Sequence, residues 1–159
     1  MNMSEEERIR QELLKNFNFL GNGIRVQRQR RIYAEVSPDK FFNVFDYAIE
    51  ALGFCILSGI TGMDEGEKLS FIYHLSSENG IVLSIKTGVA KNDPVIKTIT
   101  SYFPGAEIYE RELVDLLGTK VEGLKKGKRY PLPDNWPEGQ YPLRKDWKKE
   151  MLQEGSKNA

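Results

Sequence analysis

Residues 68–87, KLSFIYHLSSENGIVLSIKT, decide the fold of this chain. The first part, residues 68–76, is rich in the aromatic and branched side chains that are typical of a β-strand. Asn79-Gly80 is the strongest short hairpin signal in the sequence, because these residue types accept the positive φ angles of a tight turn. Residues 81–87 then alternate between apolar and polar side chains. The stretch therefore predicts two neighbouring strands joined by a hairpin.

The sequence before this hairpin predicts two helices and two further strands. A capping box, Ser followed three residues later by Glu, starts a helix near residues 4–16. Residues 31–36, RIYAEV, alternate as a half-buried strand. Ser followed by Pro then starts a second helix over about residues 38–52, and its broad apolar stripe is expected to pack on a sheet. Residues 54–61 form the next strand.

The sequence after the hairpin predicts two helices and then a tail. Asp93-Pro94 repeats the cap-plus-proline signal and predicts a helix that runs to about Phe103. A short helix over about residues 106–117 follows, and Gly118 ends it. From Thr119 onward the composition shifts to Lys, Gly, Pro and Trp, so regular structure is expected to stop.

This order of elements predicts an α+β fold. We expect a four-stranded mixed or antiparallel sheet with helices packed on one face and an extended, Pro-rich C-terminal tail. Residues 1–118 are the expected scaffold domain, residues 119–149 a docking tail, and residues 150–159 a frayed C-terminus.

The composition excludes several classes of function. Lys and Arg together number 23, as do Asp and Glu, and a net charge of zero argues against a dedicated nucleic-acid or acidic-lipid binder. One Cys and one His do not make a zinc or iron–sulfur site within this chain. No apolar run approaches the roughly 20 residues that span a bilayer. We expect an intracellular protein that contacts a membrane only through partners.

Single residues offer weak candidates for catalysis. His74 lies mid-strand and is either a proton relay or, as we favour, a strand histidine bonded to its neighbours. Cys55 lies in an apolar run and is expected to be a small buried hydrophobe rather than a nucleophile. Residues 62–66, GMDEG, are interpreted as a hairpin loop, because their acidic residues would repel phosphate.

Two basic clusters stand out in the sequence, and each is open to two interpretations. They are binding sites for RNA, or they are solvated faces that dock an acidic neighbour, and the neutral overall charge favours the second. The clusters are Arg25, Arg28, Arg30 and Arg31, and Lys120, Lys125, Lys126, Lys128 and Arg129.

The short helix over residues 106–117 is the best candidate site. On its apolar side lie Tyr109, Leu113, Leu116 and Leu117. Glu107, Arg111 and Asp115 are four residues apart and are expected to form a chain of ion pairs along another face. A plain amphipathic helix is the alternative. The carboxylates of Glu110 and Glu112 project from different sides, which argues against a shared acid–base role.

The tail PLPDNWPEGQYPLRKDW, residues 131–147, carries four prolines that stiffen an extended path. Trp136, Tyr141 and Trp147 are anchor-type side chains for an interface core. This composition favours a tail that lies on another protein. A tail that wraps back over its own domain is the alternative.

These two segments resemble motifs of a known family. YERELVDLLG is similar to the ERE-x-x-D-x-x-G helix of the 30-kilodalton subunit, also called the C subunit, of respiratory complex I and related membrane-bound nickel–iron hydrogenases. LPDNWPEGQYPLRKDW is similar to the LPDDW-x-G-x-PLRKD tail of that family. We expect docking through the matching positions Glu110, Arg111, Glu112, Asp115, Gly118, Pro133, Trp136, Pro142, Leu143, Arg144, Lys145 and Asp146.

The resemblance implies a non-catalytic accessory subunit in the hydrophilic arm of a membrane-bound, ion-translocating redox complex. Its implied partners are a hydrogenase-like large subunit, which it braces, and iron–sulfur subunits. No cofactor is implied in this chain; the iron–sulfur clusters, and in one branch a nickel–iron centre, belong to the partners. The implied location is peripheral, on the cytoplasmic side of the membrane, without nucleic acid.

Departures from the family pattern favour the hydrogenase branch over the quinone-reducing branch. Ile108 stands where an aromatic residue is usual, and residues 123–129, GLKKGKR, lack the usual His. Two alternatives remain, a free-standing protein- or RNA-binding module and an enzyme that uses His74.

Overall fold

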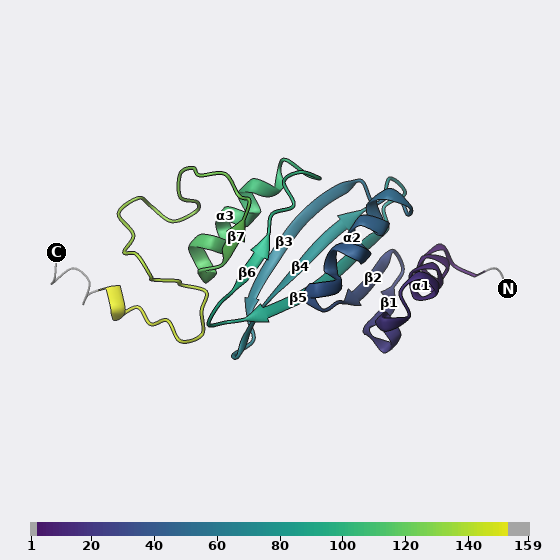
Figure 1. Cartoon of the computed structure of the whole chain (residues 1–159), viewed down its shortest axis with the longest axis horizontal. Helices are drawn as coiled ribbons and strands as arrows, with labels where there is room; N and C mark the ends of the chain where they lie inside the picture. Colours follow the sequence, from purple (N-terminus) through teal and green to yellow (C-terminus); the bar gives the residue numbers. More distant parts are fainter. Residues whose placement is uncertain (1–2, 153–159) are drawn as a thin grey trace. The chain divides into compact units, whose positions relative to one another are not determined.

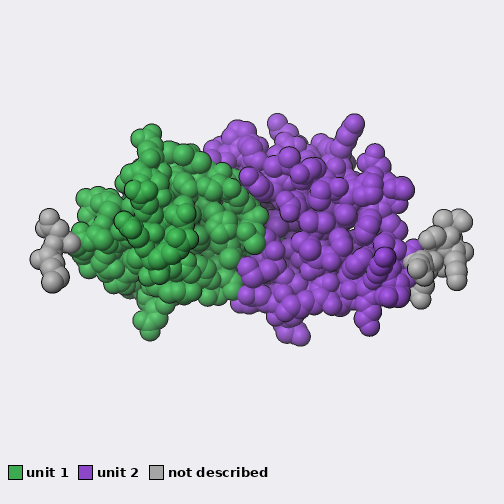
Figure 2. Space-filling model, turned by 180° about the vertical axis from the view of Figure 1, so that it is seen from behind, with its two compact units in different colours: residues 1–61, 71–88 green, residues 62–70, 89–159 purple. Residues whose placement is uncertain are grey.

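The computed structural model describes residues 3–152, which form two compact units. Unit 1 comprises the residues up to Thr61 together with Phe71–Gly88, and unit 2 comprises Gly62–Ser70 together with the residues from Val89 onward (Figure 2). The charged helix and the Pro-rich tail both belong to unit 2. The candidate site is therefore described within that unit.

The main sheet has five strands in the order β1-β2-β5-β4-β3 (Figure 1). The strands are β1 (Ile24–Arg28), β2 (Arg31–Glu35), β3 (Ile56–Asp64), β4 (Lys68–Ser76) and β5 (Val82–Ala90). β2 and β5 pair in parallel, whereas β1 pairs with β2 antiparallel. The loops that join β3 to β4 and β4 to β5 are too short for a parallel crossover, so these neighbours are antiparallel. The sheet is mixed, as predicted.

The sheet has five strands rather than the predicted four, and the additional strand is β1. Its sequence, IRVQR, carries two arginines, and Ile24 is its one buried residue. The turn into β2 passes through Arg30 at a φ of 60°. A turn of this kind usually contains Gly or Asn, so no hairpin signal is present in the sequence here.

Two helices of unit 1 confirm the predictions. α1 (Glu5–Asn16) begins after Ser4, whose hydroxyl accepts a hydrogen bond from the Glu7 backbone N–H over 3.2 Å. α2 (Phe41–Glu50) lies across one face of the sheet (Figure 1). Its Phe41 ring lies 4.6 Å from the ring of Tyr73 on β4, centroid to centroid, and Tyr73 is almost fully buried. This aromatic contact joins helix to sheet in the core of unit 1.

Unit 2 contains a second, two-stranded sheet that was not predicted. β6 (Val95–Lys97) pairs in parallel with β7 (Lys120–Glu122). The predicted helix from Asp93-Pro94 to Phe103 is wrong: VIKTIT after Pro94 is dominated by β-branched residues, which favour a strand once a partner is available. β7 supplies that partner, and it shows that regular structure continues past Thr119.

α3 (Ala106–Leu117) joins β6 to β7 and has the predicted bounds. Gly118 ends it in the left-handed conformation, with φ 69° and ψ 32°, and its backbone N–H bonds to carbonyls of the last turn. From residue 123 to residue 150 the backbone runs in turns and bends, and we call this stretch the C-terminal segment. No helix within residues 3–152 is both long enough and apolar enough to cross a membrane.

Candidate functional site

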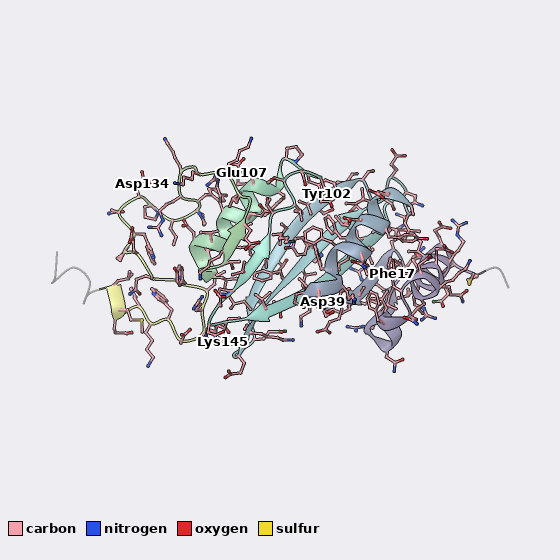
Figure 3. The ribbon with its side chains drawn as sticks, in the orientation of Figure 1. Phe17, Asp39, Tyr102, Glu107, Asp134 and Lys145 are labelled. Carbon is pink, nitrogen blue, oxygen red and sulfur yellow. The ribbon has the colours of Figure 1, made fainter. Side chains whose placement is uncertain are left out.

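The site consists of α3, the C-terminal segment and the end of β3 with the loop that follows it, all within unit 2. Glu107 on α3 and Asp134 and Lys145 in the C-terminal segment are labelled in Figure 3. The predicted docking residues fall into two groups. Some anchor the segment to its own helix, and others remain on the surface.

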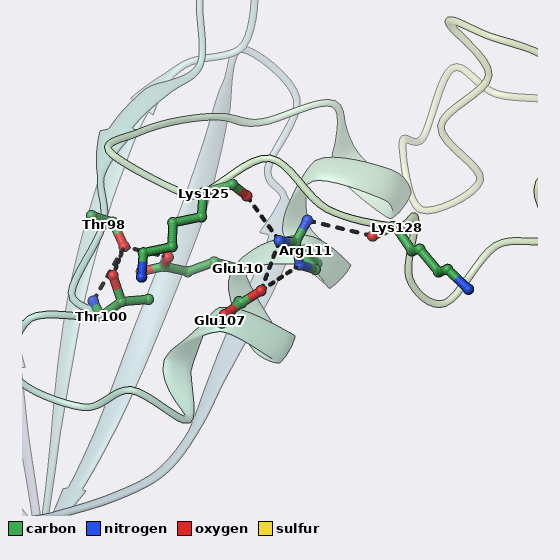
Figure 4. Close-up of polar contacts among 7 residues, drawn as sticks. All are labelled: Thr98, Thr100, Glu107, Glu110, Arg111, Lys125 and Lys128. Atoms are coloured by element: carbon green, nitrogen blue, oxygen red, sulfur yellow. Dashed lines mark hydrogen bonds and ion pairs between the residues drawn. The ribbon is translucent and has the colours of Figure 1, made fainter.

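Glu110 is a fully buried acidic residue in the N-terminal half of α3. Its carboxylate accepts one hydrogen bond from the Ile99 backbone N–H over 2.7 Å. It accepts a second from the Thr98 hydroxyl over 2.6 Å (Figure 4). Burial raises the pKa of Glu110, and these two hydrogen bonds offset part of the shift. The side chain therefore fixes the connection between β6 and α3 and presents no charge to a partner.

Arg111 ties the start of the C-terminal segment to α3. Its guanidinium donates to Glu107 over 2.7 Å and to the backbone carbonyls of Lys125 and Lys128 over 2.8 and 3.4 Å (Figure 4). Gly127 passes so close to this guanidinium that a Cβ on Gly127 would collide with it. The loop thus has a defined shape, held by a planar cation with several donors.

Asp115 is the second buried acid of α3, and it binds the next part of the segment. One carboxylate oxygen accepts from Arg129 Nε and the other from the Leu132 backbone N–H, each over 3.1 Å. Arg129 also donates to the Trp136 carbonyl over 2.7 Å. Of the predicted chain of ion pairs, the Glu107–Arg111 link is confirmed, whereas Asp115 pairs with Arg129 from the segment.

The segment returns to the C-terminal end of α3 and caps it. The Leu143 backbone N–H donates to the Leu116 carbonyl over 3.0 Å, and Arg144 Nε donates to the Leu117 carbonyl over 2.7 Å. The last carbonyls of a helix have no partner within it, so these bonds satisfy groups that would otherwise need water. The Tyr141 ring lies directly against Gly118.

Asp64, which the sequence suggested only as part of a loop, holds the end of the segment. Its side chain is 1% exposed, lies 2.7 Å from Lys91 Nζ, and accepts from the backbone N–H groups of Lys145 and Gly66, each over 2.8 Å. Burial acts to raise the pKa of Asp64, but the bonds from Lys91, Lys145 and Gly66 outweigh it and lower the pKa to about 2. Lys91 also pairs with Asp146 over 2.8 Å.

The two tryptophans of the segment form a pair. Their ring centroids are 6.1 Å apart, and both indole N–H groups donate over 2.8 Å to Gln140, Trp136 to its backbone carbonyl and Trp147 to its side-chain oxygen. Both rings are partly exposed. The segment therefore presents a fixed aromatic surface.

The structure thus shows the C-terminal segment wrapped over α3, the alternative that the sequence left open. Arg111, Asp115, Gly118 and Arg144 contribute to that packing, whereas Glu110 fixes the connection between β6 and α3. A second group of the predicted residues remains exposed or half-exposed: Glu112, Pro133, Trp136, Pro142, Leu143, Lys145 and Asp146. Leu143 is the large hydrophobic residue among them that is exposed, at 52%.

The candidates for catalysis lie outside this site, in unit 1. His74 lies 2.9 Å from Ser84 Oγ and 3.1 Å from Thr61 Oγ1, which confirms a strand histidine bonded to its neighbours; burial lowers its pKa. Cys55 is exposed, so its predicted burial is wrong: the chain enters β3 only at Ile56, and Phe54 is the residue that points inward. Within residues 3–152 no three His, Cys, Asp or Glu side chains are grouped to hold a metal.

Curated relatives of this chain are subunits of redox complexes. It is 32% identical to the C subunit of NADH-quinone oxidoreductase from Moorella thermoacetica (71% of this chain, 77% of the relative) and 33% identical to the C subunit of F(420)H(2) dehydrogenase from Methanosarcina mazei (74% and 75%). It is 30% identical to the beta subunit of the membrane-bound hydrogenase from Pyrococcus furiosus (82% and 78%). Both branches match to a similar degree, so the preference for the hydrogenase branch stays a prediction.

Solved structures share the fold. A chain of the membrane-bound sulfane sulfur reductase, an archaeal respiratory membrane complex, matches with a TM-score of 0.82 and 25% identity over 98% of this chain and 93% of that one. A trypsin-resistant fragment of Nqo5 matches with a TM-score of 0.62 over 76% and 98%. The sequence profile of the family described as "Respiratory-chain NADH dehydrogenase, 30 Kd subunit" matches residues 34–151. The chain belongs to this 30-kilodalton subunit family of oxidoreductase complexes.

Proposed function

We propose that this chain is a non-catalytic accessory subunit in the hydrophilic arm of a membrane-bound, ion-translocating redox complex, where it braces a hydrogenase-like large subunit. Its relatives carry the names of complex subunits from both quinone-linked and hydrogenase systems. In this account the iron–sulfur clusters, and a nickel–iron centre in the hydrogenase branch, belong to the partners. The chain lies peripherally on the cytoplasmic side and reaches the membrane only through them.

One observation carries this proposal: the C-terminal segment is held on its inner side by the rest of unit 2, while its outer side stays exposed. Its backbone is held by Asp115, Asp64 and the end of α3, while Leu143 keeps half of its surface exposed. A surface that is already ordered loses less conformational entropy when a partner binds. The packing therefore suits a rigid docking face.

Replacement of Leu143 by Asp tests the proposal. The substitution places a charge at the centre of the expected interface and leaves untouched the Leu143 backbone bond to Leu116. A tagged chain with Leu143→Asp is made in cells that contain the whole complex. The amount of large and iron–sulfur subunits that co-purify with it is expected to be at least tenfold lower than with the unmodified chain.

The matched control is Ile56→Asp in unit 1, because Ile56 is 50% exposed and Leu143 is 52% exposed. Ile56→Asp is expected to retain the partners, and both variants are expected to unfold at the temperature of the unmodified chain. Full retention of the partners by Leu143→Asp, or equal loss in both variants, contradicts the proposal.

A further inference from the structure

A groove of about 650 Å³ runs along unit 2 beside the first turn of α3. One wall is the start of the helix, with Pro104 and Ile108. The other is residues 126–130 of the C-terminal segment. It lies apart from the exposed Leu143, whose backbone bonds to the opposite end of the helix.

The groove has an apolar element on each wall. Ile108 on α3 is 48% exposed, and Tyr130 in the segment is 43% exposed. Single exposed apolar side chains are ordinary, but two that line one groove form a place where an apolar side chain from a partner would be buried.

The charges of the groove are unbalanced. Glu107 is paired with Arg111, and Arg129 with Asp115. Lys126 and Lys128 line the same groove and are exposed, and among residues 3–152 no acidic side chain pairs with either of them. The N-terminal end of α3 adds positive potential at the same place. The groove therefore offers two free ammonium groups next to an apolar slot.

The groove is also preformed. Arg111 holds the carbonyls of Lys125 and Lys128 (Figure 4). The close approach of Gly127 to Arg111 fixes the loop between these two residues. A wall with this support changes little when a ligand binds, so its shape and charge together select the ligand.

We propose that this groove binds an acidic segment of a partner subunit. An apolar side chain of that segment lies between Ile108 and Tyr130, and two or more carboxylates lie at Lys126 and Lys128. The identity of the partner as a member of the same complex rests on the proposed function. A protein segment fits better than a membrane or RNA, because the basic face is small, contains Glu107 and surrounds an apolar slot.

Photo-crosslinking in the assembled complex tests this inference. Tyr130 is replaced by p-benzoylphenylalanine, a photoreactive residue that keeps the Tyr ring and carries a benzoyl group in place of the hydroxyl. In a separate chain Leu143 receives the same replacement. The Tyr130 probe is expected to join a partner peptide in which at least two Asp or Glu residues lie within about four residues of each other, roughly one helical turn. Mass spectrometry of the crosslinked peptide identifies it.

Charge reversal supplies the second arm. Lys126→Glu with Lys128→Glu is expected to lower the yield of the Tyr130 crosslink about tenfold, as the loss of two charge pairs implies. Lys148→Glu with Lys149→Glu makes the same change of charge at exposed lysines outside the groove, and it is expected to leave the yield unchanged.

The two probes separate the two proposals. The groove proposal is overturned if the Tyr130 probe gives no product, or a product on lipid, RNA, a second copy of this chain or a peptide without acidic residues. If the Leu143 probe still joins a redox subunit in that case, the proposed function stands. Failure of both probes to reach any redox subunit overturns both. A Tyr130 product that survives charge reversal at full yield also overturns the groove.

Discussion

Arg144 donates its Nε hydrogen to the carbonyl oxygen of Leu117, 2.7 Å away, while its guanidinium lies 4.9 Å from the centre of the Tyr141 ring. One side chain from the Pro-rich segment therefore satisfies the end of α3 and covers the ring that packs on Gly118. The conformation of the C-terminal segment therefore depends on its contacts with α3.

Loss of the Arg144 side chain is expected to destabilise the segment. Arg144→Ala removes a charge-assisted hydrogen bond and a cation–π contact, so the free energy of unfolding is expected to fall by about 1–3 kcal/mol. Lys145→Ala is the control, because the contact of Lys145 with Asp64 is made by its backbone N–H. Urea unfolding of both variants measures the effect, and equal stability of the two would contradict this role of Arg144.

The contact between Gly118 and Tyr141 is testable with a pair of glycines. Gly118 and Gly139 have φ angles of 69° and 72°, so Ala at either position carries a similar backbone cost. A Cβ at Gly118 would lie 2.5 Å from Tyr141 Cε2, whereas a Cβ at Gly139 meets no atom within 4 Å. Gly118→Ala is therefore expected to cost about 1–3 kcal/mol more than Gly139→Ala in urea unfolding. Equal costs would show that the ring moves aside freely.

Asp64 is expected to make the stability of the chain depend on pH in the acid range. Its pKa is about 2 in the folded chain against an ordinary value of 3.8, so its contribution is fully present above 3.8 and is lost as the pH falls through 2. That contribution is about 2 kcal/mol. Asp64→Asn is expected to flatten the fall in unfolding free energy between pH 4 and pH 2, relative to the exposed control Asp134→Asn. The same slope in both variants would contradict the buried pairing with Lys91.

Glu110 is expected to change the stability of the chain with pH in the opposite direction from Asp64. Because its pKa is raised by burial, its contribution to stability is greatest below the ordinary value of 4.5 and decreases as the pH rises through the folded pKa. Glu110→Gln keeps a side-chain oxygen for the Ile99 N–H and is expected to remove this decrease.

Glu110→Ala is the contrasting variant. It leaves the buried Ile99 N–H without a partner and opens a void, so it is expected to cost about 2–4 kcal/mol at pH 7. Urea unfolding from pH 4 to pH 8 distinguishes the two variants. If Ala costs no more than Gln, the carboxylate does not hold the connection between β6 and α3.

Sequence alone is sufficient for elements whose signals are local. Gly118 marks the end of α3 by a backbone conformation that Gly adopts at little cost, and the hairpin at Asn79-Gly80 follows from turn chemistry. The bounds of α3 are therefore predictable. The strand β6 is not, because residues 95–97 become a strand only when β7, more than twenty residues later, pairs with them.

The same limit applies to the site. The charged helix and the Pro-rich segment are recognisable as motifs, but their contacts depend on tertiary structure. Asp115 is four residues from Arg111, a spacing that predicts a pair, whereas the fold brings Arg129 to it. Asp64 lies 81 residues from Lys145 and carries no local signal beyond a turn. The sequence places Asp64 in a hairpin loop, whereas the structure places it at the end of β3, and its role becomes visible only once the segment lies against it.

A structure of the assembled complex tests the central claim most directly. We predict that residues 131–147 of this chain lie buried against the large subunit, with Leu143 in the interface and every cluster and metal held by other subunits. A structure in which this segment faces solvent, or in which side chains of this chain ligate a redox centre, would contradict it.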